Sequence, residues 1–202
     1  MSEPIASPAV SSTVGIKNVV LAALTEDTEA TLSYDALQLL AGAIDVQIAP
    51  QNAEPDVQYF DDTEGSVVYP DPEIKVTMEQ ADIPLLLQEK ILGNTIDENG
   101  VLIRRASDSP PYFALGFKSE KSDGSYRYVW LYKGRATPLT EQYHTKEGKT
   151  VTRQTGKIEW TFIKRTHDGE YQALADDGQN GFSPAKAATF LQSVYQPVYA
   201  AP

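Results

Sequence analysis

Eight carboxylates lie between Asp45 and Glu73 without one Lys or Arg among them, and they form the densest group of reactive side chains in the chain. They are Asp45, Glu54, Asp56, Asp61, Asp62, Glu64, Asp71 and Glu73. A pair of carboxylates can catalyse acid hydrolysis, and a cluster of them can bind a cation or repel an anion. A buried, unpaired carboxylate costs several kcal/mol or becomes protonated. We therefore expect these groups to stay in water or to face something positive.

No motif that carries enzyme chemistry accompanies these acids. The two histidines, His144 and His167, lie near turn dipeptides and do not form a His-Glu-x-x-His zinc motif. The chain has neither a Gly-x-Ser-x-Gly elbow nor a Gly-rich phosphate loop, and its lack of cysteine excludes disulfides and thiolate metal sites. Residues 61–65 (DDTEG) lack the spacing of a calcium loop. We predict no catalytic residue, no metal and no cofactor.

The charge is unevenly distributed along the chain. Residues 1 to 100 hold 18 Asp and Glu against three Lys and Arg, and residues 101 to 202 hold 10 against 14. The first half therefore carries about −15 and the second about +4, for a formal charge of −11. Nucleic-acid affinity comes mainly from Lys and Arg that displace counterions, so this balance argues against DNA as a tightly bound ligand. The difference in charge between the two halves indicates a building block whose charge is polarised.

Length and composition indicate one β-rich domain. A chain of 202 residues suits a single domain and should bury roughly 70% of its unfolded surface. A hydrophobic content of 41%, with 11 Tyr, supports packed β structure. The first residues lack the features of a signal peptide, and no apolar run approaches the ~18 residues that span a bilayer. We expect a soluble protein that is cytosolic when it is made.

Alternating apolar residues predict two half-buried strands around the acidic stretch. They are GAIDVQI (42–48), with Ile44, Val46 and Ile48 on one face, and EIKVTME (73–79), with Ile74, Val76 and Met78 on one face. Residues 50–72 between them are too many for a tight hairpin and too rich in Val and Tyr for a structureless loop. Long excursions of this kind are usually functional.

The rest of the first half is less uniform. Residues 16–24 (IKNVVLAAL) predict a first strand. For residues 25–40 two interpretations stay open, because Ser33 can cap a short helix through Leu40 and the stretch can equally run extended. Residues 83–92 (IPLLLQEKIL) predict a helix that ends at Gly93.

Turn dipeptides divide the second half into a strand meander followed by a helix. The turns are Asn99-Gly100, Asp123-Gly124, Glu147-Gly148 and Asp168-Gly169, and the strands are PYFALGF (111–117), YRYVWLYKG (126–134) and KIEWTFIKR (157–165). In the last strand Ile158, Trp160 and Phe162 share the face that feeds the core. Ser183 and Pro184 begin a helix over residues 183–194. The predicted fold class is mainly β, an antiparallel sandwich or barrel with one or two flanking helices.

An aromatic ladder in residues 126–134 has two interpretations. Tyr126, Tyr128, Trp130 and Tyr132 alternate along the expected strand. Such a face can stack on sugars, or it can pack against the sheet or a helix, and the second interpretation is the commoner one.

Several runs together carry a resemblance to a known family. They are LLAGAIDVQIAPQNAEPDVQYFDDTEG (39–65), YPDPEIKVTMEQADIPLLLQEKILG (69–93), DENGVLIRR (97–105), PPYFALGFKSEKSDGSYRYVWLYKGRA (110–136) and KIEWTFIKR (157–165). Over residues 14–197 the chain resembles the major tail proteins of long-tailed siphophages that infect Gram-positive bacteria, which are tail tube subunits. Order, spacing and turn positions agree. Residues 29–40 depart from the family, which tends to run extended where this chain carries helix formers.

The resemblance implies a structural role in a self-assembling tube. In the family, hexameric rings stack into a hollow tube, and each subunit lends strands to an inner β-barrel. We expect the lumen of this tube to be acidic and to conduct the viral DNA during ejection into the host. Carried over by position, the lumen strands hold Ile44, Asp45, Val46, Gln47, Ile48, Ile74, Lys75, Val76, Thr77 and Met78. Residues 50–72 become a loop that reaches the adjacent ring, and the acids that face the next ring or the lumen are Glu54, Asp56, Asp61, Asp62, Glu64, Asp71 and Glu73.

The resemblance also implies partners, location and organisation. Partners are further copies of the chain, stacked head to tail, the tail tape measure, tail tip and tail terminator proteins, and double-stranded viral DNA as transient cargo, with no membrane. The expected location is the virion tail, after assembly in the host bacterial cytoplasm. The expected organisation is an N-terminal arm (1–14), one β domain (15–196) and a C-terminal tail (197–202), with arm and tail touching neighbours.

Two other function classes stay open at the sequence level. One is a monomeric carbohydrate-binding or adhesin-like β-sandwich that uses the aromatic ladder. The other is an acidic hydrolase with a carboxylate pair, since any acidic chain offers carboxylates that can come close in space.

Overall fold

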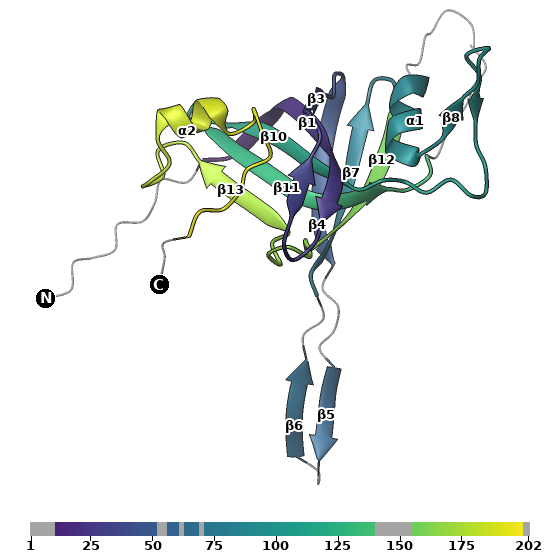
Figure 1. Ribbon diagram of the computed structural model, residues 1–202. Coiled ribbons are helices and arrows are strands. Elements are labelled where there is room, and N and C mark those ends of the chain that lie inside the picture. The colour runs from purple at the N-terminus through teal and green to yellow at the C-terminus, as the bar shows by residue number, and fades with distance from the viewer. Residues whose placement is uncertain (1–10, 52–55, 61–62, 69–70, 140–154, 200–202) are drawn as a thin grey trace, which may run out of the picture.

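Strands dominate the structure (Figure 1). The computed structural model describes residues 11–51, 56–60, 63–68, 71–139 and 155–199, and these contain thirteen strands and two helices. All ten strand pairings in this part of the chain are antiparallel. The expected mainly β, antiparallel fold with flanking helices is confirmed.

The elements fall into one large sheet, two small sheets and two helices. The large sheet holds β1 (Thr13–Asp27), β2 (Leu32–Tyr34), β3 (Gln38–Leu39), β4 (Ala43–Gln51), β7 (Glu73–Gln80), β10 (Phe113–Lys121), β11 (Tyr126–Ala136), β12 (Gly156–Ile163) and β13 (Gln172–Asp176). The small sheets are β5 (Asp56–Phe60) with β6 (Thr63–Val68), and β8 (Thr95–Ile96) with β9 (Leu102–Ile103). The helices are α1 (Leu85–Leu92) and α2 (Pro184–Thr189).

The large sheet forks at β11. Its order is β2-β1-β10-β11-β12-β7-β4, with β3 added to β1 and β13 added to β11. One edge of β11 pairs with β10, while the other pairs with β13 along residues 127–131 and with β12 along residues 133–136. The fork therefore places two strand sets, one ending at β13 and one ending at β4, on the same supporting strand.

A β-bulge in β11 lies at the fork. Phe113 is opposite Gly134, and Leu115 is opposite Leu131, so two residues of β11 face Ala114 alone. An extra residue of this kind exchanges the two faces of the strand beyond it. The alternation expected along residues 126–134 therefore does not continue past the bulge.

Most of β11 is buried on both faces. Val129 and Leu131 lie in a main core that also contains Ile158, Trp160 and Phe162 of β12. These three β12 side chains are at most 1% exposed, as the alternation in residues 157–165 predicts. The core is formed by β1, β10 and β11 on one side and β12, β7 and β4 on the other, with Ile91 and Leu92 of α1 packed into it. Beyond the bulge Ala136 joins this core.

The aromatic ladder forms a second core beneath the C-terminal helix. Tyr128, Trp130 and Tyr132 are at most 6% exposed and pack with Phe190 and Val194. The Trp130 Nε1–H donates a 2.9 Å hydrogen bond to the Phe190 carbonyl oxygen. The packing interpretation of the ladder is therefore confirmed, and these three rings cannot form an open sugar platform.

Local structure confirms some of the expected element ends and shifts others by a few residues. Helix α1 ends at Gly93 in a left-handed conformation with φ 69°, and Ser183 caps α2 by accepting from the Lys186 amide. Helix α2 ends at Thr189, so the helix expected to reach residue 194 is shorter. Residues 25–40 run extended, as β2 and β3 pair with β1, and the helical alternative is wrong. Strand β1 is longer than residues 16–24 and begins at Thr13.

A cluster of polar contacts joins the C-terminal end of β1 to β11. The Lys133 ammonium lies 2.5 Å from the Asp27 carboxylate, which also accepts from the backbone amides of Thr166 and His167. Burial opposes ionisation of Asp27, but these donors outweigh it and hold the pKa of the carboxyl below its usual value. The bulge makes this contact possible, because it turns Lys133 out of the main core.

Two glycines lie directly beneath buried rings, and enlarging them should destabilise the fold. A Cβ atom on Gly116 would lie 2.6 Å from the Trp130 ring, and one on Gly134 would overlap the Phe162 ring. We expect Gly116→Ala and Gly134→Ala each to lower the free energy of unfolding by about 1–3 kcal/mol, because both rings are fully buried. Denaturant titration of the purified chain measures this. Gly15→Ala, which has no neighbour within 4 Å, is the matched control, and an equal loss there would contradict the argument.

Candidate assembly surfaces

The two strands that flank the acidic excursion pair with each other. In the antiparallel pair β4 and β7, Asp45 is opposite Glu79, Gln47 is opposite Thr77, and Ala49 is opposite Lys75. Residues directly opposite in an antiparallel pair share a face. The structure therefore brings the proposed lumen strands together and defines one polar face across them.

The ten lumen-strand candidates divide between the two faces. Ile74, Val76 and Met78 are at most 2% exposed, and Val46 and Ile48 pack against the same main core. Asp45, Gln47, Lys75 and Thr77 lie on the opposite, polar face, which has no second core against it among the described residues. Only this second group can face a channel, because the first is occupied in holding the sheet to the core.

Ile44 belongs to neither group. Ala43 is opposite Gln80 and Asp45 is opposite Glu79, so Ile44 is an extra residue in β4. Its side chain is 53% exposed and not in line with Val46 and Ile48, contrary to the alternation expected along residues 42–48. A bulge cannot be read from a period-two pattern, since the residues around it still alternate in type.

The polar face carries both signs of charge. It continues from β7 onto β12 and β11, where Glu79 is opposite Lys157, Lys75 is opposite Thr161, and Thr161 is opposite Arg135. On the described strands its charged residues are the carboxylates Asp45, Glu73, Glu79 and Glu159 and the cations Lys75, Lys133, Lys157 and Arg135. Four carboxylates against four cations leave it close to neutral, so the acidic excess of the first half lies mainly elsewhere.

The acidic excursion contains a hairpin that projects from the main sheet (Figure 1). Strands β5 and β6 pair only with each other among the described strands, with an irregularity between Gln58 and Tyr59. Asp56 and Glu64 lie within these strands. Glu54, Asp61 and Asp62 lie outside the described residues. The expectation that residues 50–72 form more than a structureless loop agrees with the two strands.

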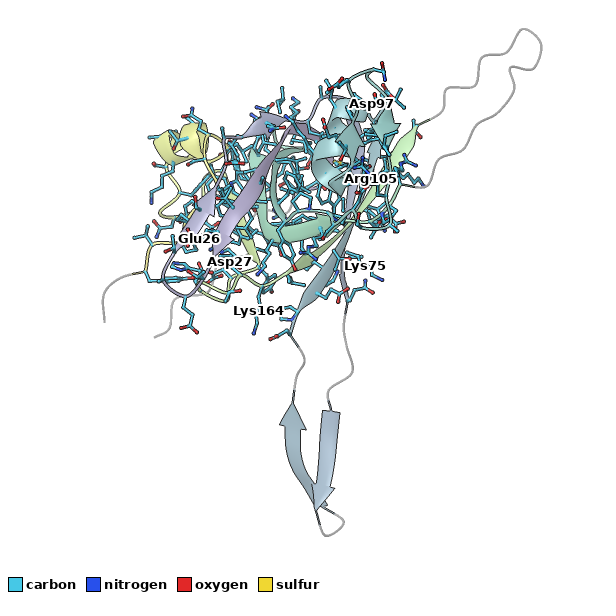
Figure 2. The ribbon with its side chains drawn as sticks, turned by 45° about the vertical axis from the view of Figure 1, so that its right-hand side comes forward. Glu26, Asp27, Lys75, Asp97, Arg105 and Lys164 are labelled. Carbon is cyan, nitrogen blue, oxygen red and sulfur yellow. The ribbon has the colours of Figure 1, made fainter. Side chains whose placement is uncertain are left out.

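The base of the excursion has a basic partner that lies far from it in sequence. The Lys164 ammonium is 2.8 Å from the Asp71 carboxylate, with the two side chains 47% and 69% exposed. Figure 2 shows Lys164 and Lys75 at the end of the main sheet from which the hairpin leaves. The local sequence gives no sign of this pair, and exposed pairs of this kind contribute little to stability. Glu73, also at the base, is exposed.

Strand β4 presents an open edge. It ends the order of the large sheet and pairs with β7 alone among the described strands. Such an edge exposes unpaired backbone amides and carbonyls, which can accept a strand from another chain. Together, the polar face, the open edge and the projecting hairpin form a candidate assembly region built on β4 and β7.

The titratable groups of the described residues show little that suits catalysis. Every described carboxyl with a shifted pKa is shifted downward, whereas a general acid needs a raised one: these are Asp27, Asp97, Asp108, Asp123 and Asp176. The His167 ring is exposed and contacts the Thr28 carbonyl oxygen through Nδ1. No cluster suited to a metal ion occurs within the described residues. None of the helices in this part of the chain is long and apolar enough to cross a membrane.

The chain was compared with protein-family models and with curated proteins. A family model described as phage tail tube protein matches residues 12–198, nearly the whole chain. No curated protein matches the chain.

Substitutions should separate the polar face from the core face of the same strands. We expect Gln47→Ala and Thr77→Ala each to change the free energy of unfolding by no more than about 0.5 kcal/mol, because their side chains lie away from the core. Met78→Ala, one residue further along β7, should cost about 2–5 kcal/mol, because Met78 is fully buried. Thermal or denaturant unfolding of the three variants measures this. A loss at Thr77 as large as that at Met78 would contradict the assignment of faces.

Proposed function

Because this chain belongs to the phage tail tube protein family, we propose that its copies form hexameric rings that stack head to tail into a tube for ejection of viral DNA. The chain is a structural component of the phage virion tail. The observation that carries the finer proposal is the β4 and β7 pair, which has one face in the core, one polar face and an open edge.

The polar face of β4, β7, β12 and the end of β11 lines the lumen. Duplex DNA carries one negative charge per ~1.7 Å, so a basic wall would make many phosphate contacts and retard passage. Here four cations, Lys75, Lys133, Lys157 and Arg135, share the face with four carboxylates. A face with balanced charge does not bind DNA phosphates tightly. Any acids that the hairpin adds to the lumen repel the phosphates. The wall therefore guides DNA without binding it.

Assembly within a ring uses the open edge of β4. Pairing this edge with a strand of the adjacent copy continues the inner sheet around the axis and removes an aggregation hazard. Stacking between rings uses the hairpin of β5 and β6, which leaves the subunit at the end of β4. The tape measure, tail tip and tail terminator proteins then bound the tube inside and at its ends, and assembly takes place in the host cytoplasm.

Electron microscopy of the purified chain tests the proposal. Under assembly conditions of high protein concentration and moderate salt, we expect tubes with a central channel and a regular axial repeat, with six subunits in each ring. A population of monodisperse globules under all conditions would count heavily against the proposal. A glycan array with a clear hit would instead favour the carbohydrate-binding alternative, although burial of Tyr128, Trp130 and Tyr132 removes its main support.

Charge reversal in the excursion should affect the tube and leave the subunit intact. We expect Asp61→Lys, Asp62→Lys and Glu64→Lys together to disturb ring stacking or DNA passage, because the charge that faces the next ring or the lumen changes sign. The thermal unfolding temperature of the isolated subunit should stay the same, since β5 and β6, the described strands of the excursion, project away from the main sheet. Tube length and phage infectivity are the measurements. Unchanged tube length and unchanged infectivity would show that these three acids take no part in ring stacking or DNA passage.

A further inference from the structure

Two cations and a hydroxyl form a row across three strands of the polar face. Arg135 of β11 is opposite Thr161 of β12, and Thr161 is opposite Lys75 of β7. Residues opposite one another in antiparallel strands share a face, and neighbouring strands lie about 4.8 Å apart. The backbone positions of Arg135 and Lys75 are therefore about 10 Å apart, with Thr161 between them. We call Arg135, Thr161 and Lys75 the cationic row.

The subunit does not neutralise the two cations of the cationic row. Lys75 and Arg135 are both exposed, and the ion pairs between described residues include neither of them. Lys133, on the same face, differs in this respect, because it pairs with the Asp27 carboxylate, which is 6% exposed. The charges of Lys75 and Arg135 are therefore available to an anion from another molecule.

The donors of the cationic row suit phosphate oxygens. Arg135 Cζ lies over the Tyr112 ring, 3.9 Å from its centre, and this contact restrains the guanidinium on the polar face. A guanidinium offers five N–H donors in a planar fork that matches phosphate, a Lys ammonium adds three, and the Thr161 hydroxyl adds one. Arg, Lys and Thr side chains are among the groups that proteins commonly use to contact the phosphates of DNA.

Carboxylates lie on both sides of the cationic row along the strands. Towards the hairpin, Glu73 precedes Lys75 by two residues in β7 and so shares its face. Away from the hairpin, Glu159 is opposite Thr77, and one level further Asp45 is opposite Glu79. Figure 2 shows Lys75 near the end of the sheet from which the hairpin leaves. The nearly neutral face is therefore banded, with one level of cations between levels that carry carboxylates.

We propose that the cationic row contacts the phosphates of double-stranded DNA as the duplex moves along the polar face. This rests on the proposed function, in which that face lines the channel. A duplex carries one negative charge per ~1.7 Å of its axis, so a phosphate is within reach of the row at every position of the DNA. The flanking carboxylates repel the same phosphates, so each contact is weak and brief. Copies of the row around one ring centre the duplex without holding it.

NMR titration of the isolated subunit tests the contact, because no second core covers the polar face among the described residues. The titration is done at low salt and below the concentration at which tubes form. We expect a duplex of about 12 base pairs to shift the amide signals of Lys75, Thr161 and Arg135, with a Kd weaker than about 10⁻⁴ M that rises steeply with salt. Shifts confined to other parts of the subunit, or no shifts, would overturn the inference.

Two double variants separate the cationic row from net charge. We expect Lys75→Gln with Arg135→Gln to raise the Kd for the duplex at least about fivefold, because two phosphate contacts are lost. Lys118→Gln with Lys157→Gln is the matched control: it removes the same charge, but Lys118 is opposite Tyr128 of the second core and Lys157 is opposite Glu79. The control should change the Kd less than about twofold. Equal weakening by both variants would show that net charge alone attracts the duplex, and would refute the row.

A second probe distinguishes DNA from an acidic protein segment. Polyglutamate carries carboxylates in place of phosphates, and we expect it to shift the amides of the cationic row less than the duplex does at equal charge. Equal shifts and equal affinity would mean that the row binds negative charge of any kind, and the assignment to DNA would be wrong.

The titration also separates this inference from the proposed function. Tubes in the electron microscope together with a silent cationic row would leave the proposed function intact and refute the phosphate contact. Shifts in the row of a chain that forms no tubes under any condition would support the phosphate contact and refute the proposed function.

Discussion

The bulge in β11 is the constraint on which the rest of the architecture depends. A strand buried on both faces can support two cores, but only if its residues fit both. Before the bulge, Tyr128 and Trp130 fill the core under α2, while Val129 and Leu131 fill the main core. After it, the faces exchange, and β11 passes from β13 to β12. Without the extra residue, the C-terminal end of β11 would direct Lys133 into the main core.

The bulge also positions the strands proposed for assembly. Strand β12 pairs with β11 only beyond the bulge, β7 pairs with β12, and β4 pairs with β7. Gly134 lets the Phe162 ring lie flat across β11 at the first step of this chain of contacts. Lys133, released from the core, reaches Asp27 and joins the end of β1 to the same point. The position of the polar face of β4 and β7 therefore depends on the bulge in β11, which is three strands away from β4 in the sheet.

Patterns of residue type predicted the regular parts of the fold and missed the irregular ones. Alternation identified the buried residues of β7 and β12, because a strand with one face in a core has a strict period of two. It failed at Ile44 and at Lys133, where one extra residue changes the face without changing the local pattern. Residues 25–40 carry helix formers but run extended, because pairing with β1 outweighs a weak local propensity. The pair between Asp71 and Lys164 joins residues 93 apart and leaves no trace in the local sequence.

The distribution of charge determines which forces can hold copies of this chain together. At a formal charge of −11, identical chains repel one another over a distance set by the salt, about 8 Å at physiological ionic strength. The described polar face is close to neutral, so lining a channel with it does not gather negative charge from every strand. The acids instead concentrate in the excursion between residues 50 and 72. In the tube that we propose, contact between copies through this segment would work against repulsion between like charges, so its attraction would have to come from short-range contacts. A nearly neutral wall, in the same proposal, would have no strong affinity for DNA, because phosphate binding needs an excess of Lys and Arg.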